Sequence, residues 1–322
     1  MAKNGVSRRD FLGKGALVTG AAGVAGCVGL AAEPKAAKPL KVRYGLNLLL
    51  YTATFSKDRV DLVKKVADMG FDGVEVPFND LSVLDAKATR EAITKAGVGL
   101  TSCCVMMPGT NPCSEKPEER KTGVDRLRQM ADLTAEMGGE VVAGPLYSPV
   151  GYLTKKARTA DEWKWCADGL RAAAEHAEKA KVLLTIEPLN RFETYVFNTV
   201  GDATKMIREV NHPNLKVQVD TFHCNIEEKD TAAAIRACGA DVGHFHACEN
   251  DRGTPGTGQV RWKEVFAALR DIDYSRWITI ESFATGILDL CAAACIWRPI
   301  YDSADGLATN GLAFLKKMAA EA

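Results

Sequence analysis

The sequence predicts a single (β/α)8 TIM barrel, and three observations support that fold class. First, eight short runs rich in β-branched and apolar residues alternate with segments of helical periodicity from residue 42 onward. Second, eight strands alternating with helices is the element count of this barrel. Third, the alternative of an open doubly wound sheet would place a glycine-rich turn after the first strand, and LYTATFSK at 50–57 contains no glycine.

Each expected strand is a short apolar run that ends at a turn signal, and the patterns between the strands repeat with the period of a helix. Several of these helical patterns end in glycine, which is typical of a helix C-terminus. The expected strands are 42–50, 72–76, 99–106, 140–146, 182–188, 215–220, 242–247 and 277–283. The clearest helical patterns are 59–70, 121–139, 161–180, 262–272 and 304–322.

The N-terminal residues have a different composition and predict an export signal. Arg8 and Arg9 precede Phe11, Leu12 and a mild Ala/Gly/Val run that is too short and too glycine-rich for a membrane span. We therefore expect a twin-arginine signal at 1–31, a polar linker at 32–41 and the catalytic barrel at 42–322. This organisation implies recognition by the twin-arginine export machinery and a periplasmic location.

The signal segment also contains a second possible processing site. Val24-Ala25-Gly26-Cys27 resembles a lipobox, which would make Cys27 a lipidated first residue and anchor the protein to the membrane. If that site is not used, cleavage between Ala31 and Ala32 satisfies the preference for small residues around the cleavage point.

Composition excludes several other classes of protein. The chain has 322 residues, 47% of them hydrophobic and 25% charged, with a formal net charge of zero and no basic stripe. This balance disfavours a nucleic-acid surface and a polybasic membrane patch. The ten cysteines include no CxxC pair, so a zinc cage is disfavoured, and their scattered positions indicate small buried hydrophobes rather than disulfides.

Four consecutive strands end on side chains that can bind a metal ion. Strand 182–188 ends at Glu187, 215–220 at Asp220, 242–247 at His246 and 277–283 at Glu281. Active sites of TIM barrels lie at the carboxyl ends of the strands, so these groups are expected at one rim. Three carboxylates and one imidazole favour a single Mn²⁺, with Mg²⁺ or Co²⁺ as alternatives, over a thiophilic metal.

Other polar residues follow these strand ends. The loops just beyond them contain Glu193, His223 and Arg252. The glycine-rich GTPGTG at 253–258 lacks the Lys-Ser/Thr of a P-loop, which favours a lid or a substrate-shaping loop. His244 shares a strand face with His246 but is expected one layer deeper, as a hydrogen-bonded histidine.

These motifs resemble those of the sugar isomerase/epimerase barrels, and within them the D-tagatose 3-epimerase / D-psicose (allulose) 3-epimerase group. The matching text is IEPLNRFE at 186–193, VDTFHCN at 219–225, GHFHACENDRGTPGTG at 243–258 and TIESF at 279–283. The resemblance implies dimers or tetramers. It also implies a metal site and a sugar site, formed respectively by Glu187, Asp220, His246 and Glu281 and by Glu193, His223 and Arg252.

The activity that the resemblance implies is C3 epimerisation of a free ketose through an enediolate. One of Glu187 and Glu281 would remove the C3 proton, and the other would return a proton to the opposite face. The strand tips LNLLLYTATF at 46–55 and GPLYSPVG at 144–151 depart from the usual family wording, so the sugar stays open. The alternative is an exported isomerase, lyase or hydratase that acts on 3-keto-sugars or 3-keto-glycosides.

Overall fold

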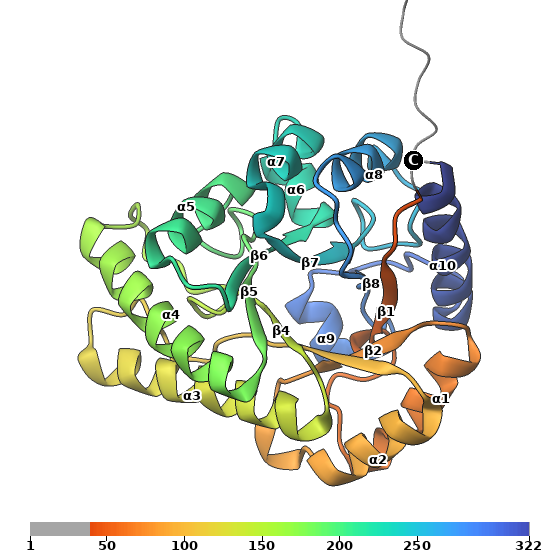
Figure 1. Ribbon diagram of the computed structural model, residues 1–322, viewed down its shortest axis with the longest axis horizontal. Coiled ribbons are helices and arrows are strands. Elements are labelled where there is room, and N and C mark those ends of the chain that lie inside the picture. The colour runs from red at the N-terminus through yellow and green to blue at the C-terminus, as the bar shows by residue number, and fades with distance from the viewer. Residues whose placement is uncertain (1–38, 322) are drawn as a thin grey trace, which may run out of the picture. The chain divides into compact units, whose positions relative to one another are not determined.

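The computed structural model describes residues 39–321, in which eight parallel strands close into a barrel in chain order, with β8 beside β1 (Figure 1). All eight predicted strands are present. Their bounds are β1 Arg43–Asn47, β2 Gly73–Pro77, β3 Gly99–Cys103, β4 Val141–Gly144, β5 Leu183–Ile186, β6 Leu215–Asp220, β7 Val242–Ala247 and β8 Trp277–Ile280. The predicted signal at 1–31 and most of the predicted linker lie outside the described residues.

Most of the helices lie around the outside of the barrel, whereas α9 lies inside their ring in this view (Figure 1). Two helices follow β6, and a short helix precedes the last one. Their bounds are α1 Asp61–Asp68, α2 Ala86–Ala96, α3 Pro117–Met137, α4 Ala160–Ala180, α5 Val200–Val210, α6 Thr221–Glu227, α7 Thr231–Cys238, α8 Trp262–Asp271, α9 Leu288–Ala293 and α10 Ala304–Glu321. Within residues 39–321, no helix is both long enough and apolar enough to cross a membrane.

Local sequence signals fix where several helices begin and end. Thr159 and Thr199 accept hydrogen bonds from the third backbone N–H of α4 and α5, and each forms a capping box with the acidic residue there. Gly97 and Gly138 end α2 and α3 with φ values of 68° and 84°, which a residue with a Cβ adopts only at a cost. These boundaries hold the helices in register with the strands.

The floor of the barrel is closed by the indole of Trp277, the first residue of β8. The side chain is 1% exposed and donates its ring N–H to Glu140. A Cβ on Gly73 or Gly99, the first residues of β2 and β3, would lie 2.4 Å and 2.7 Å from this ring. The glycines therefore make room for the indole, and the opposite end of the barrel is left for the polar residues.

The cysteines in residues 39–321 are all free thiols, and all but Cys295 are buried. For that part of the chain this arrangement confirms that the cysteines form no disulfide framework and that all of them except Cys295 are small buried residues.

Candidate active site and metal centre

The four predicted metal ligands meet at the carboxyl end of the barrel. Glu187 follows β5 directly, Asp220 ends β6, His246 lies in β7 and Glu281 follows β8. The Nδ1 atom of His246 lies 3.5 Å from Glu281 Oε1, 3.6 Å from Asp220 Oδ2 and 4.0 Å from Glu187 Oε1. None of these four residues is more than 5% exposed. Neighbouring strands therefore bring these groups to one buried point, as their positions in the sequence predict.

The electrostatics of this cluster fit a divalent cation. His246 Nδ1 and Glu187 Oε1 are buried and have no hydrogen-bond partner. Burial, and then the charge of Asp220, raises the pKa of Glu187 well above its ordinary value. Burial lowers the pKa of His246, but the charges of Glu75 and Glu281 outweigh it and hold that pKa well above the usual range. A crowded carboxylate such as Glu187, whose pKa is raised in this way, is a group that a cation would stabilise in its charged form.

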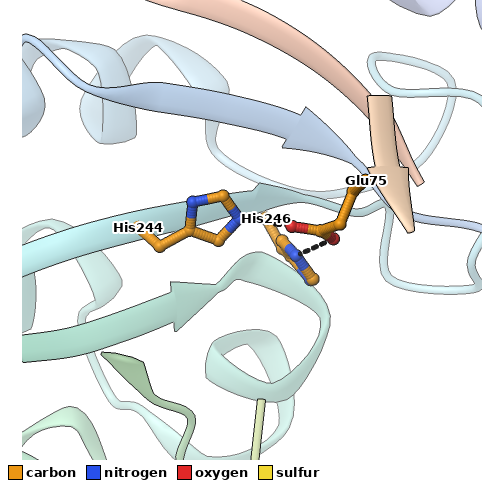
Figure 2. A group of neighbouring side chains, drawn as sticks. All are labelled: Glu75, His244 and His246. Atoms are coloured by element: carbon orange, nitrogen blue, oxygen red, sulfur yellow. Dashed lines mark hydrogen bonds and ion pairs between the residues drawn. The ribbon is translucent and has the colours of Figure 1, made fainter. Parts of the chain in front are cut away.

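Glu75, which the sequence analysis did not select, lies at the centre of the buried network. Figure 2 shows its carboxylate, from β2, between the rings of His244 and His246 on β7. Its two oxygens lie 2.8 Å from the Nε2 atoms of His244 and His246. Thr101 and Asn47 donate further hydrogen bonds of 2.9 Å and 3.0 Å to it. Burial raises the pKa of Glu75, but the two histidines outweigh that effect, so its pKa is well below the ordinary value.

This carboxylate determines which atom His246 presents to the cluster. Because Nε2 donates its proton to Glu75, the other ring nitrogen, Nδ1, faces Glu187, Asp220 and Glu281. His244 is hydrogen-bonded to the same carboxylate one layer deeper, as expected. One signal in the sequence could have identified Glu75: it is a carboxylate in the apolar run GVEVP, where a buried charge requires partners.

Arg252 and His223, two of the three predicted sugar-binding residues, border the predicted metal ligands. Arg252 Nη1 donates to Glu281 Oε2 at 2.7 Å and to Asp220 Oδ2 at 3.1 Å. His223 Nε2 lies 4.0 Å from Glu187 Oε1. One expectation was wrong: His223 lies in the first turn of α6 and not in a loop, because the chain turns into a helix directly after Asp220.

Glu193, the third of these residues, is joined to His223 through Asn190. The side chain of Asn190 donates to Glu193 Oε1 at 2.7 Å, and its backbone N–H donates to His223 Nδ1 at 3.1 Å. Burial raises the pKa of Glu193. Glu193, His223 and Arg252 line one cavity of about 210 Å³ together with Glu187 and Glu281. The predicted sugar site and two of the predicted metal ligands therefore share a single space.

Most of the remaining wall of this cavity is apolar, and only part of it comes from the strand tips that depart from the family wording. Its wall includes Leu49 after β1, Val105 after β3, Val150 after β4 and Phe283 and Leu290 after β8. The glycine-rich loop 253–258 is not part of the lining. Gly256 lies against Phe314 of α10, and the N–H of Gly258 donates to Glu249 Oε1 at 2.7 Å. The expectation that this loop shapes the pocket is therefore not met in the described structure.

Fold and site together define a barrel enzyme with a carboxylate and imidazole centre at the ends of β5 to β8. Residues 63–318 match the xylose isomerase-like TIM barrel family, and the chain belongs to that family. A "Probable ketose 3-epimerase" of Synechocystis sp. is 31% identical over 277 residues, which are 86% of this chain and 96% of that protein. The "D-psicose 3-epimerase" of Agrobacterium fabrum is 32% identical over 85% of this chain and 98% of its own length.

A solved structure gives the same result. The D-allulose 3-epimerase from Methylomonas sp., in complex with D-allulose, superposes with a TM-score of 0.82 at 28% identity and covers 88% of this chain and 99% of its own. The resemblance inferred from the motifs is thus confirmed over most of the chain. The protein is an enzyme of the isomerase class.

Proposed function

We propose that this chain catalyses the C3 epimerisation of a free ketose with one bound divalent cation, Mn²⁺ first among Mn²⁺, Mg²⁺ and Co²⁺. The observation that carries the proposal is the convergence of Glu187, Asp220, Glu281 and the unpartnered Nδ1 atom of His246 beside the cavity that Glu187 and Glu281 line. The oxygen-rich donor set supports a hard cation. The names of the relatives support a ketose as the substrate.

Glu187 and Glu281 are the proton carriers in this proposal. A cation held by Glu187, Asp220, His246 and Glu281 would act as a Lewis acid toward the carbonyl at C2 and so acidify the C3 proton. One glutamate removes that proton, and the other returns a proton to the opposite face of the enediolate. The two side chains follow β5 and β8, which are not adjacent, and both line the cavity, so they can flank C3 from two sides.

Arg252, His223 and Glu193 hold the sugar. Burial lowers the pKa of His223 to about 3, so the ring is neutral. Its Nδ1 accepts the N–H of Asn190, which leaves the proton on Nε2, the ring nitrogen that lies 4.0 Å from Glu187 Oε1. His223 and Arg252 can therefore donate to the O2 oxygen as negative charge develops on it, and Glu193 accepts from a hydroxyl further along the sugar.

The test replaces each proton carrier. Glu187→Gln and Glu281→Gln should each lower the rate of C3 epimerisation about 10²- to 10⁴-fold, because each removes one of two required acid–base groups. The measurement is deuterium incorporation at C3 of a ketose in heavy water, with Glu175→Gln on the exposed face of α4 as the control. Full epimerase activity in either cavity variant would contradict the two-carrier mechanism.

The same assay examines the alternative substrate. Free ketoses and 3-keto-glycosides are offered side by side to the wild-type protein. If only the glycosides are turned over, a 3-keto-glycoside replaces the free ketose as the proposed substrate. The roles of Glu187 and Glu281 stay the same.

We also propose that the protein is exported to the periplasm through residues 1–31 and acts as a homo-oligomer, a dimer or a tetramer. Arg8 and Arg9 followed by an apolar run support the export signal, with Cys27 as the alternative lipid anchor. Replacing Arg8 and Arg9 by Lys should retain the precursor in the cytoplasm, which cell fractionation measures. Light scattering of the purified protein checks the oligomer, and a monomer would contradict it.

A further inference from the structure

Cys248 provides a sulfur atom beside the carboxylates, and the proposed epimerisation does not use it. Its Sγ atom lies 3.1 Å from Asp220 Oδ2 and 3.8 Å from Glu281 Oε2, and the side chain is fully buried. The ligand atoms of Asp220, Cys248 and Glu281 all lie within 4.8 Å of one another, which is the spacing of a group that can hold a metal ion. A thiol in this position requires an explanation.

The three donor atoms face one point, which a positive group already occupies. Arg252 Nη1 lies 3.0 Å from Cys248 Sγ, 3.1 Å from Asp220 Oδ2 and 2.7 Å from Glu281 Oε2. Beside this point, His246 Nδ1 and Glu187 Oε1 remain without any partner. The cluster therefore contains two further buried ligand atoms to which the guanidinium makes no hydrogen bond.

The donor types differ from those of the proposed catalytic centre. Mn²⁺ and Mg²⁺ prefer oxygen ligands such as carboxylates, whereas thiolates select thiophilic cations such as Zn²⁺ and Cd²⁺. We propose that Asp220, Cys248 and Glu281 form a binding site for a thiophilic divalent cation, which inhibits the enzyme. The inhibition rests on the proposed function, because that function assigns Asp220 and Glu281 to the catalytic cation.

Occupancy of this site has two consequences. As the bond from Cys248 Sγ to the cation forms, the thiol proton passes to the solvent. Arg252 Nη1, which contacts the same three donor atoms, moves away from them. Since Asp220 and Glu281 would serve either cation, a thiophilic ion and Mn²⁺ should exclude each other. Cys248 contributes to the first ion and not to the second, which makes the two separable by mutation.

The experiment titrates Cd²⁺ into the cation-free protein and follows the ultraviolet absorption of a cadmium–thiolate bond. The wild-type protein should show a saturable band that Mn²⁺ suppresses. Cys248→Ser should remove the band and weaken Cd²⁺ binding by about tenfold or more, with Mn²⁺ affinity kept within about threefold, as measured by calorimetry. Cys248→Ala serves as a second variant if the serine protein does not fold.

Cys103→Ser is the matched control. The buried thiol of Cys103 lines the cavity, lies 3.9 Å from the other oxygen of Glu281, Oε1, and is not in the cluster with Asp220. The Cys103→Ser substitution should leave the cadmium–thiolate band unchanged. A band that is absent in the wild-type protein, or that persists at full height in Cys248→Ser, overturns the inference. Epimerisation with Mn²⁺ is measured separately, so the cadmium result and the proposed activity can fail independently.

Discussion

At the scale of single residues, the site depends on which atom of His246 carries a proton. The carboxylate of Glu75 accepts from the Nε2 atoms of both His244 and His246, so neither ring needs a proton on Nδ1 for that contact. For His246 this directs an unpartnered nitrogen at three carboxylates. In the proposed centre, Glu75 would therefore determine whether His246 can bind the cation, although Glu75 is not itself one of the proposed ligands.

Glu75→Gln tests this dependence. The amide of glutamine has one acceptor oxygen and one donor NH₂ group. The Nε2 atom of one of the two histidines would then face a donor, and the proton of that ring would move to Nδ1. We expect Mn²⁺ affinity to fall about 10- to 100-fold, measured by calorimetry. Glu249→Gln is the control, because Glu249 is also fully buried but contacts Trp262 and Gly258. Equal affinities of the two variants would show that Glu75 does not position the ligand.

At the scale of elements, the barrel depends on matched glycines and one indole. Gly73 and Gly99 begin β2 and β3, and Trp277 begins β8 across the barrel interior. A strand normally gains stability from β-branched residues at such positions. These two strands begin with glycine because the space beside each backbone is filled by the same buried ring.

Gly99→Ala should therefore destabilise the protein by about 1–3 kcal/mol, since the new methyl would overlap the Trp277 ring. Gly201→Ala is the matched control. It lies on the exposed face of α5, and its nearest atom, Thr199 Oγ1, is 3.7 Å from a built Cβ. There alanine should be neutral or stabilising by up to about 1 kcal/mol. Chemical denaturation measures both, and an undiminished free energy of unfolding for Gly99→Ala would contradict this account of the floor.

At the scale of the whole molecule, the buried thiols couple stability to pH. Burial raises the pKa of Cys104 from 9.0 to about 12, and burial raises that of Cys238 from 9.0 to about 11. Below pH 9 each thiol is neutral in the folded and unfolded chains alike. Above pH 9 the unfolded chain loses these thiol protons first. The free energy of unfolding therefore falls as the pH rises toward the pKa values of the thiols in the folded protein.

The free energy of unfolding should then fall by up to about 1.4 kcal/mol per pH unit for each thiol between the two pKa values. Cys238→Ala should reduce this slope between pH 9 and 11, whereas Cys295→Ala, at an exposed cysteine, should not. Urea denaturation at several pH values measures the slope. The same slope in the Cys238→Ala and wild-type proteins would exclude the thiol as its source.

Much of the fold and part of the site could be predicted because they depend on local patterns. The period of apolar residues identified all eight strands, and the carboxyl ends of β5 to β8 identified Glu187, Asp220, His246 and Glu281. Glu75 was missed because it is 171 residues from His246 in the chain. Neither sequence spacing nor strand periodicity states which inward side chains of distant strands meet.

The sequence by itself determined the order of the elements, the rim at which the polar groups gather and the resemblance to ketose 3-epimerases. Only the tertiary structure decided that Glu75 holds both histidines, that Cys248 and Arg252 share the carboxylates of Asp220 and Glu281, and that loop 253–258 lies against α10. The physical reason is that side-chain period is a local property of a strand. Contact across a closed barrel depends on the stagger of all its strands and on the side-chain rotamers within it.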